Sequence, residues 1–530
     1  MKFQELKVTK TNEIKDGEMM VFSLGDGKEV LLCNFNGQIS ALAPYCTHYG
    51  APLADGILSG GKIICPWHHA CFNAKSGDLL EPPAQDSLSK YEVKIKGDDV
   101  IIIYPEKPEG SRAPVMVKKD SSLDKRTFII IGGGAAGNAA AQAMREAGFN
   151  GNILIVTQEN RTPYDRPNLS KDYLQGTAQP EWMPLRSEDF YKEYGIDFLL
   201  NKKVKSVDSK NKKISFEHGD DLNYDKLLLA PGGIPRKLNL PGSDLKNIFY
   251  LRSFDDSDLI IEALKNSSKA VIIGASFIGM ETAFSLSGRG LKVIVIAPEK
   301  IPFENLFGKE IGNLFKKKLE EKGIEFKLNN QVKGFEGDDS VKNVILQNDE
   351  KINTDFVVIG IGVKPATEFL TGFNLEKDGS IKVDEYMKVT NDIFAAGDIA
   401  SFTDWRTGEL TRIEHWRTAL QQGRVAGFNM AGKKTPYKKV PFFWTNQAGL
   451  SFNYVGHTKS WDEIINKGDI NEATFVSYFI KDNKIAAAAG NWMDKELDAV
   501  EILMLDDKLP SPDELKKENF DVVGLASNLK

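Results

Sequence analysis

The stretch Phe128-Ile-Ile-Ile-Gly-Gly-Gly-Ala-Ala-Gly137 decides the fold of most of this 530-residue chain. Its apolar start predicts a buried strand, and the alanine-rich segment after the glycines predicts a helix. Between them, Gly132 allows a tight turn, Gly134 lets the backbone approach a pyrophosphate, and Gly137 permits close packing of helix on strand. The helix N-terminus offers free amides and a favourable dipole to phosphates. The stretch therefore predicts a dinucleotide-binding unit.

The carboxylate that completes such a unit is expected about twenty residues later, at the end of the next strand. Residues 153–156, Ile-Leu-Ile-Val, form that predicted strand, and Gln158-Glu159 follow it. We expect Glu159 to bind the ribose hydroxyls, one position beyond the usual place. A glycine turn that merely packs against its neighbours is the alternative.

A second, less regular copy of the motif follows the apolar run Ala270-Val-Ile-Ile. Gly274 and Gly279 occupy its outer positions, and Ser276 replaces the middle glycine. Serine is small, so we expect this turn to admit a pyrophosphate as well. The copy predicts a second nucleotide-binding domain.

The choice between NADH and NADPH depends on the end of the ribose-reading strand, residues 293–296. An acidic residue there favours NADH, and a nearby basic residue favours NADPH. Ala297 follows the strand directly, and Glu299 and Lys300 then favour opposite cofactors. The sequence leaves this choice open.

Two further apolar runs complete the alternation of strands and helices. Phe356-Val-Val-Ile leads to Gly362, and a later run ends in Gly397-Asp398. This order predicts two nested dinucleotide-binding domains, the second inserted into the first. The expected boundaries are a small all-β domain at 1–104, a charged, proline-bearing linker at 105–125, a first nucleotide domain at 126–251 and 376–437, a second at 252–375, and a C-terminal α+β domain at 438–530.

Two Cys-His pairs lie in predicted loops of the N-terminal domain. Cys46-Thr-His48 is followed, after sixteen residues, by Cys65-Pro-Trp-His68. This order suits a Rieske iron–sulfur centre, in which one iron takes two sulfurs and the other takes two imidazole nitrogens. A structural zinc site is the alternative, although it usually places two cysteines before a second pair of ligands. His69 also lies near Cys65, but the two-residue spacing selects His68.

Composition narrows the function further. A net charge of −6 gives no reason to expect nucleic-acid or anionic-membrane binding. We see neither an apolar signal core at the N-terminus nor a run of about 18 apolar residues that predicts a membrane span. None of the four cysteines lies beyond Cys71, so we expect no disulfide framework, no redox-active disulfide beside a flavin, and a cytoplasmic location.

Six stretches across residues 126–530 carry a resemblance, and they occur in the family's order: Pro163-Tyr-Asp-Arg-Pro-Asn-Leu-Ser-Lys171, Ala230-Pro-Gly-Gly233, Gly274-Ala-Ser-Phe-Ile-Gly-Met-Glu281, Phe394-Ala-Ala-Gly-Asp398, Glu414-His-Trp416 and Pro441-Phe-Phe-Trp444. This part resembles apoptosis-inducing-factor-like flavoproteins and the ferredoxin reductases of bacterial oxygenase systems. The N-terminal domain resembles Rieske ferredoxins. The resemblance implies a Rieske [2Fe-2S] domain fused to a flavoprotein with an FAD-binding domain, an inserted NAD(P)-binding domain and a C-terminal interface domain.

The resemblance also implies roles for single residues. Arg166 and Lys171 would lie along the flavin, and Glu281 would pair with Lys171, so that the lysine can stabilise negative charge on the reduced ring. Asp398 would accept hydrogen bonds from the ribityl chain. The remaining matched residues would surround the isoalloxazine and the nicotinamide entrance: Glu414, His415 and Trp444. An ordinary surface ion pair, a structural histidine and a core tryptophan are the respective alternatives for Lys171–Glu281, His415 and Trp444.

The expected activity is that of an NAD(P)H-dependent oxidoreductase. Electrons would pass from NADH or NADPH through FAD to the [2Fe-2S] cluster, and then to an acceptor for which an oxygenase is the candidate by analogy. Two alternatives stay open: a slowly turning redox sensor of the apoptosis-inducing-factor-like kind, and a zinc module that recruits partners. The ligand loops lack the extra cysteines of high-potential Rieske proteins, and His69-Ala-Cys71 stands where Gly and small residues are common. We therefore expect a potential near the low end of roughly −150 to +300 mV.

Overall fold

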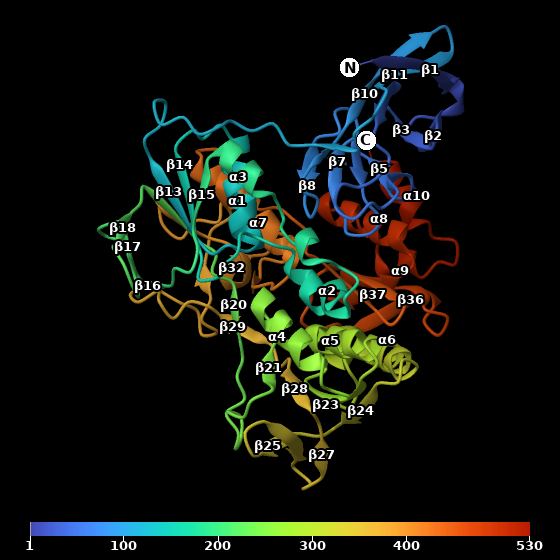
Figure 1. The fold of residues 1–530 in the computed structure, drawn as a ribbon. Coiled ribbons are helices and arrows are strands. Elements are labelled where there is room, and N and C mark those ends of the chain that lie inside the picture. Colours follow the sequence, from blue (N-terminus) through green and yellow to red (C-terminus); the bar gives the residue numbers. More distant parts are fainter. Residues whose placement is uncertain (1, 530) are drawn as a thin grey trace.

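The structure, a computed structural model, describes residues 2–529 and begins with an all-β domain (Figure 1). Two antiparallel sheets form this domain, one in the order β1-β11-β10-β4-β3-β2 and one in the order β5-β6-β7-β8. The strands of the first sheet are β1 (Phe3–Lys10), β2 (Met19–Gly25), β3 (Lys28–Phe35), β4 (Gln38–Leu42), β10 (Lys90–Lys96) and β11 (Asp99–Pro105). The strands of the second are β5 (Ile57–Ser59), β6 (Lys62–Ile64), β7 (Cys71–Asn73) and β8 (Leu79–Glu81). The first Cys-His pair lies in the loop that connects β4 of the first sheet to β5 of the second, and the second pair lies between β6 and β7 of the second sheet.

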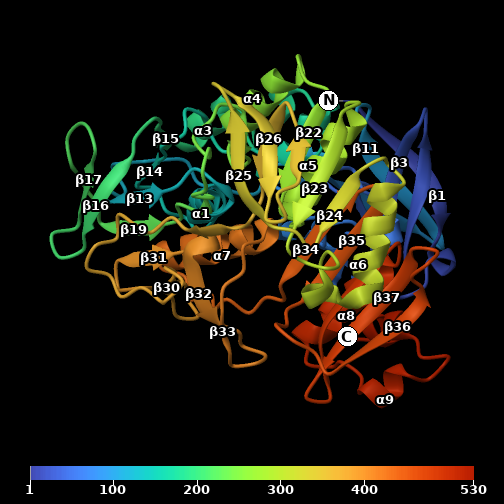
Figure 2. The same ribbon diagram turned by 90° about the horizontal axis from the view of Figure 1, so that it is seen from below.

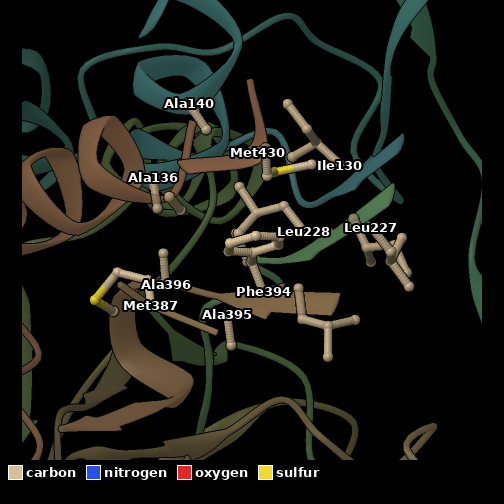
Figure 3. Packing of buried hydrophobic residues seen from close by; sticks show 14 of the residues in the cluster. Ile130, Ala136, Ala140, Leu227, Leu228, Met387, Phe394, Ala395, Ala396 and Met430 are labelled. Atoms are coloured by element: carbon tan, nitrogen blue, oxygen red, sulfur yellow. The ribbon is translucent and has the colours of Figure 1, made fainter. Parts of the chain in front are cut away.

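The first nucleotide domain contains a parallel sheet in the order β15-β14-β13-β19-β31. Its elements are β13 (Thr127–Ile131), β14 (Asn152–Val156), β15 (Ile196–Leu199), β19 (Lys226–Leu229), β31 (Ile393–Ala395), α1 (Ala135–Glu146), α3 (Glu188–Tyr194) and α7 (Trp416–Met430). The turn after β13 requires glycine, because Gly132 has φ +119° and a Cβ there would lie 1.9 Å from the carbonyl oxygen of Ala230. Figure 3 shows how Ile130, Leu228 and Phe394 pack near α1 and α7.

The second nucleotide domain contains the parallel sheet β21-β28-β22-β23-β24. Its elements are β21 (Ile248–Tyr250), β22 (Lys269–Ile273), β23 (Lys292–Ala297), β24 (Glu325–Leu328), β28 (Phe356–Ile359), α4 (Phe254–Leu264), α5 (Phe277–Gly288) and α6 (Glu304–Glu320). Only after this sheet is complete does the chain return to the first sheet with β31. The nesting therefore follows from the strand order, and the predicted α/β class is confirmed.

Each nucleotide domain also contains smaller sheets. They are formed by β16 (Val204–Asp208), β17 (Lys213–Phe216) and β18 (Leu222–Asn223); β20 (Gly233–Pro235) and β29 (Val363–Pro365); β25 (Val332–Gly337), β26 (Val341–Leu346) and β27 (Lys351–Asn353); and β30 (Ile381–Lys382), β32 (Ala400–Thr403) and β33 (Leu410–Thr411). The short helix α2 (Asp172–Gln175) follows the loop that contains Lys171.

The C-terminal domain packs helices on an antiparallel sheet in the order β34-β35-β38-β37-β36 (Figure 2). Its elements are β34 (Phe442–Gln447), β35 (Leu450–Gly456), β36 (Glu463–Asp469), β37 (Thr474–Lys481), β38 (Lys484–Asn491), α8 (Asp494–Leu505), α9 (Pro512–Leu515) and α10 (Val522–Ser527). The predicted α+β class of this part is confirmed. Within residues 2–529, no helix is both long and apolar enough to cross a membrane.

The N-terminal domain rests on the C-terminal domain. One hydrophobic cluster contains Ile57, Ile64 and Cys71 of the ligand-bearing sheet together with Val500 of α8 and Ala526 of α10. Figure 1 shows β5, β7 and β8 beside α8 and α10. The two ends of the chain thus share a core.

Residues 105–125, predicted to be a linker, make backbone hydrogen bonds to both adjoining domains. β12 (Ser111–Arg112) pairs with β9 (Ser87–Leu88), and the N–H of Asp120 donates to the carbonyl of Asn150 at 2.8 Å. The backbone hydrogen bonds hold this segment against both of its neighbours. The predicted domain boundaries remain our proposal.

Candidate functional site

The four predicted metal ligands converge from two similar loops. The Nδ1 atoms of His48 and His68 lie 3.1 Å apart, and the thiols of Cys46 and Cys65 lie close enough that each shifts the pKa of the other. Among residues 2–529, no three His, Cys, Asp or Glu side chains lie close enough together to hold a single metal ion. Sulfur pairs with sulfur and nitrogen with nitrogen, as the two irons of a Rieske cluster require, so these residues fit a [2Fe-2S] group better than a zinc ion.

Burial prepares these side chains as ligands. Cys46, Cys65 and His68 are at most 5% exposed. Burial lowers the pKa of His48 to about 3 and also lowers the pKa of His68, so both imidazoles are neutral, which is the form that binds metal. The Cys46 sulfur accepts backbone N–H groups from its own loop. Such amides stabilise thiolate charge.

A cavity of about 1050 Å³ lies beside this metal site. Most of the residues predicted to contact FAD line it: Gly132, Gly134, Glu159, Arg166, Lys171, Glu281, Asp398, Glu414, His415 and Trp444. The cavity extends from the glycine turn after β13 to the start of α7 and the first residues of β34. Its length and its glycine cradle fit an extended dinucleotide such as FAD.

The remaining predicted glycines do not line the cavity. A Cβ at Gly137 would lie 2.1 Å from the carbonyl of Gly132, and one at Gly279 would lie 2.3 Å from the carbonyl of Gly274. These two residues allow close packing of helix on turn in each nucleotide motif, and Gly274 has φ +106° in the turn itself. Gly362 has φ +91° and faces open space. The second turn therefore retains the geometry of a pyrophosphate-binding motif despite Ser276.

Glu159 and Arg166 meet at one end of the cavity. The guanidinium of Arg166 donates to Glu159 at 2.7 Å, and the hydroxyl of Tyr164 donates to the same carboxylate at 2.5 Å. Arg166 also donates to the carbonyl of Arg252 at 2.6 Å. The structure thus places Arg166 against the predicted ribose-binding carboxylate.

Lys171 and Glu281 form a buried ion pair across the domain boundary. Nζ of Lys171 lies 2.9 Å from Oε1 of Glu281, which is 4% exposed. The hydroxyls of Ser170 and Thr445 each donate to the same carboxylate at 2.6 Å. The geometry is that of a held lysine and not of a surface pair. Ser170 and Thr445 escaped the sequence reasoning, although each is adjacent to a predicted site residue.

A second charged group lies around Asp398. Arg252 donates to its carboxylate at 2.7 Å, and Arg412 donates to its main-chain carbonyl at 3.0 Å. Arg412 also pairs with Glu414, whose pKa is raised by burial. Neither arginine was predicted. The sequence separates Arg252 from Asp398 by 146 positions, whereas Arg412 lies only two positions before the predicted Glu414.

His415 has a buried Nδ1 with no hydrogen-bond partner in the described part of the chain. Burial lowers its pKa to about 4, so the ring is neutral. It lies 4.7 Å from the ring of Phe443 and lines the cavity. An unsatisfied nitrogen at this place is available to a ligand in the cavity.

Trp444 connects the cavity to the metal site. Its ring lies 4.6 Å from that of His68 and 6.1 Å from that of His48, and it also lines the cavity. Tyr49 stacks on His48 at 4.0 Å, and its hydroxyl donates to Asp165 of the loop that leads to Lys171. Both histidine ligands therefore face the wall of the cavity.

Comparisons with known proteins agree with this geometry. Residues 126–423 match the model of the pyridine nucleotide-disulphide oxidoreductase family, residues 4–92 match the Rieske [2Fe-2S] domain, and residues 442–526 match the reductase C-terminal domain. Apoptosis-inducing factor 3 of Homo sapiens is 37% identical over 497 residues, covering 92% of this chain and 81% of its own. The rubredoxin-NAD(+) reductase of Pseudomonas putida is 32% identical over 64% of this chain and 88% of its own. The crystal structure of a covalent putidaredoxin reductase–putidaredoxin complex matches 76% of this chain and 99% of its own with TM-score 0.72 and 28% identity.

Proposed function

The chain belongs to the pyridine nucleotide-disulphide oxidoreductase family and carries a Rieske domain, and from this premise we propose that it passes electrons from NAD(P)H through FAD to its own [2Fe-2S] cluster and on to an acceptor protein. It is an NAD(P)H- and FAD-dependent oxidoreductase of the ferredoxin-reductase kind. The finer proposal concerns the order of the cofactors and the place where the electrons leave.

One observation supports this order above the others. Trp444 lines the FAD cavity and at the same time lies 4.6 Å from the ring of His68. A cluster held by His68 and His48 is therefore separated from the cavity by about one aromatic side chain. This proximity favours direct transfer inside the chain.

The protein's own groups bind FAD, orient it and adjust its electrostatic environment. When bound, FAD supplies the conversion between the two-electron chemistry of a nicotinamide and the one-electron chemistry of an iron–sulfur cluster. Gly132, Gly134 and the N-terminus of α1 cradle the pyrophosphate. Lys171 holds a positive charge at the cavity wall, where it stabilises electron density that develops on a reduced ring. Glu281 keeps that lysine in place.

An anaerobic titration tests the proposal. The purified holoprotein is titrated with NADH and, separately, with NADPH, while flavin absorbance and the paramagnetic resonance of the cluster are followed. We expect flavin and cluster to become reduced together, and a cluster that stays oxidised beside a reduced flavin would refute the relay. NADH and NADPH have nearly the same reduction potential, so the nucleotide that reduces the flavin faster at equal concentration is assigned as the donor.

The acceptor is proposed by analogy with relatives of this chain. The named relatives include a reductase of rubredoxin and a complex with putidaredoxin, so separate electron carriers serve them. In this chain the Rieske domain occupies the position of a carrier, and we propose that an oxygenase or another one-electron acceptor takes electrons from it.

A slowly turning redox sensor is the second candidate, because the likeness to apoptosis-inducing factor 3 spans 92% of the chain. Steady-state reduction of a one-electron acceptor separates the two. Rapid NAD(P)H-dependent turnover supports the electron-transfer enzyme, whereas a long-lived reduced complex supports the sensor.

A further inference from the structure

The residue after the second histidine ligand adopts a backbone conformation that favours glycine. His69 has φ +57°, in the left-handed region, where few side chains are found without strain. It is also completely buried. A glycine would adopt this turn freely. The contacts of the imidazole must therefore offset both the strain and the burial.

The His69 imidazole lies between two carboxylates of α8. Its Nδ1 is hydrogen-bonded to Glu501, and its Nε2 lies 3.1 Å from Oδ1 of Asp498. Its ring stacks on Phe442 of β34 with the ring centroids 3.9 Å apart. These contacts join a ligand loop of the N-terminal domain to the C-terminal domain, since Glu501 lies 432 positions further along the chain.

Arg417 of α7 brings the FAD-binding domain to the same place. Its Nη1 and Nη2 both donate to Oε1 of Glu501 at 2.9 Å, Nη2 also donates to the carbonyl of His69 at 2.9 Å, and Nε donates to the carbonyl of Pro82 at 3.0 Å. We call His69, Arg417, Asp498 and Glu501 the interdomain clamp, because they come from three domains. All four residues are at most 3% exposed.

A buried ionic group of this kind specifies geometry more than it adds stability. The cost of removing charges from water offsets much of their attraction, but a buried charged group that loses a partner is costly. Arg417 and Glu501 both belong to the reductase and stay paired when the Rieske domain moves. Undocking would instead remove the hydrogen bonds of Arg417 to the carbonyls of His69 and Pro82 and the hydrogen bond of Glu501 to His69, which leaves these buried charged groups with fewer partners. The clamp therefore opposes any undocked position of the second ligand loop.

We propose that the interdomain clamp fixes His68 beside Trp444 and keeps the Rieske domain docked on the reductase throughout turnover. The proposal rests on the proposed function in that electrons cross this boundary. For each hydride, two electrons leave the reduced flavin with release of one proton, and they reduce the cluster in two one-electron steps, each followed by transfer to the acceptor protein. A fixed pair performs both steps without the encounter that two separate proteins need. His69 is a positioning residue in this scheme.

Replacement of His69 by glycine tests the imidazole without disturbing the turn, because glycine adopts the same backbone conformation. His69→Gly relieves the strained backbone and removes the imidazole. Asn36→Gly is the matched control, since Asn36 has φ +53° in an exposed turn of the same domain. If the clamp acts as proposed, amide hydrogen exchange in residues 65–71 and in α8 becomes at least about tenfold faster in His69→Gly and stays unchanged in Asn36→Gly. Unchanged or slower exchange in His69→Gly would overturn the clamp.

The second readout is the rate at which the cluster is reduced. In stopped-flow experiments with NADH, we expect His69→Gly to reduce its flavin at the wild-type rate and its cluster at least about tenfold more slowly, with cluster content equalised by iron and sulfide analysis. Equal rates of cluster reduction in the two proteins would contradict a positioning role. If neither NADH nor NADPH reduces the wild-type cluster, the proposed function fails, while hydrogen exchange still decides the clamp.

A second variant covers failure of His69→Gly to fold. Glu501→Gln keeps the volume of the side chain and weakens the bonds to both His69 and Arg417. We expect the same faster exchange in residues 65–71. Where His69→Gly folds, a double-mutant cycle of the two variants should give a combined effect smaller than the sum of the single effects, because both remove one interaction. Strict additivity would show that His69 does not act through Glu501.

Discussion

The two ligand loops make the same turn with different residues. In the first, the N–H of Gly50 donates to the carbonyl of Cys46 at 2.9 Å, and in the second, the N–H of His69 donates to the carbonyl of Cys65 at 3.0 Å. Both residues have positive φ, +77° and +57°. A Cβ at Gly50 would meet no atom within 4 Å, whereas His69 is fully buried among charged groups.

The difference shows that a residue at a turn can also connect the turn to another domain through its side chain. The backbone conformation favours glycine at both places, and the first loop has glycine there. The second loop has a strained histidine, whose side chain connects the loop to α8. One loop is held mainly by its own fold, and the other by the rest of the molecule.

The largest expected effect treats both loops alike. Cys46→Ser and Cys65→Ser should each abolish the cluster, because each removes one of the two thiolates on a single iron. Iron and acid-labile sulfide analysis with paramagnetic resonance measures the loss. Cys33→Ala is the control, since Cys33 is a buried thiol outside the loops and should leave the cluster intact. A full cluster in either ligand variant would contradict the assignment.

A histidine at position 50 should strain the first loop in the way that His69 strains the second. Gly50→His introduces the strain of His69 without any carboxylate partner. We expect it to lower the free energy of unfolding by about 1–2 kcal/mol and to retain the cluster. Chemical denaturation followed by the visible absorbance of the cluster measures both. Unchanged stability would mean that this turn imposes no cost on a side chain.

In the described part of the chain, the hydroxyl of Tyr49 connects the first loop to the reductase: it donates to Asp165 and accepts from Asn168 at 3.5 Å. Removing this hydroxyl should have a smaller effect. Tyr49→Phe deletes the hydrogen bond to Asp165 and should lower stability by about 1 kcal/mol. We expect cluster reduction to slow much less than in His69→Gly. Tyr45→Phe is the matched control, because the hydroxyl of Tyr45 donates to Glu29 within the Rieske domain. A loss equal to that of His69→Gly would show that both loops are clamped.

The smallest effect is a pH dependence at the start of α8, the helix that holds the second loop. Burial raises the pKa of Asp494 to about 6, although Asn453 donates a hydrogen bond to it. The folded state binds the proton more tightly than the unfolded state, so this group lowers stability as pH rises from about 4 to 6 and the loss persists above. Asp494→Asn should therefore be more stable than the wild type at pH 8, by less than about 1 kcal/mol.

Thermal unfolding at both ends of this range measures the difference. The advantage of Asp494→Asn should shrink toward pH 4, where the wild-type carboxyl is protonated in both states. An advantage that grows on acidification would contradict the sign of the pKa shift.

Local sequence patterns predicted much of this molecule. The glycine turn after β13 and the four metal ligands depend on spacings of a few residues, and the structure gathers them as expected. The structure places His68 against His48 and turns His69 toward Glu501, and the choice of His68 as the ligand stays a prediction.

Long-range contacts escaped prediction. Arg252 with Asp398, Thr445 with Glu281 and His69 with Glu501 join residues more than 140 positions apart. Composition gives no signal for such pairs. A histidine at a turn position that prefers glycine was the one local sign that the side chain had a partner elsewhere.

The separation of 432 positions between His69 and Glu501 has a consequence for biosynthesis. The second ligand loop leaves the ribosome long before α8 exists, and at about 5–20 residues per second the interval is roughly 20–90 s. Arg417 is synthesised 84 positions before Glu501, so both of these partners of His69 are made late. Until Glu501 has been synthesised, the second ligand loop lacks its hydrogen bond to α8.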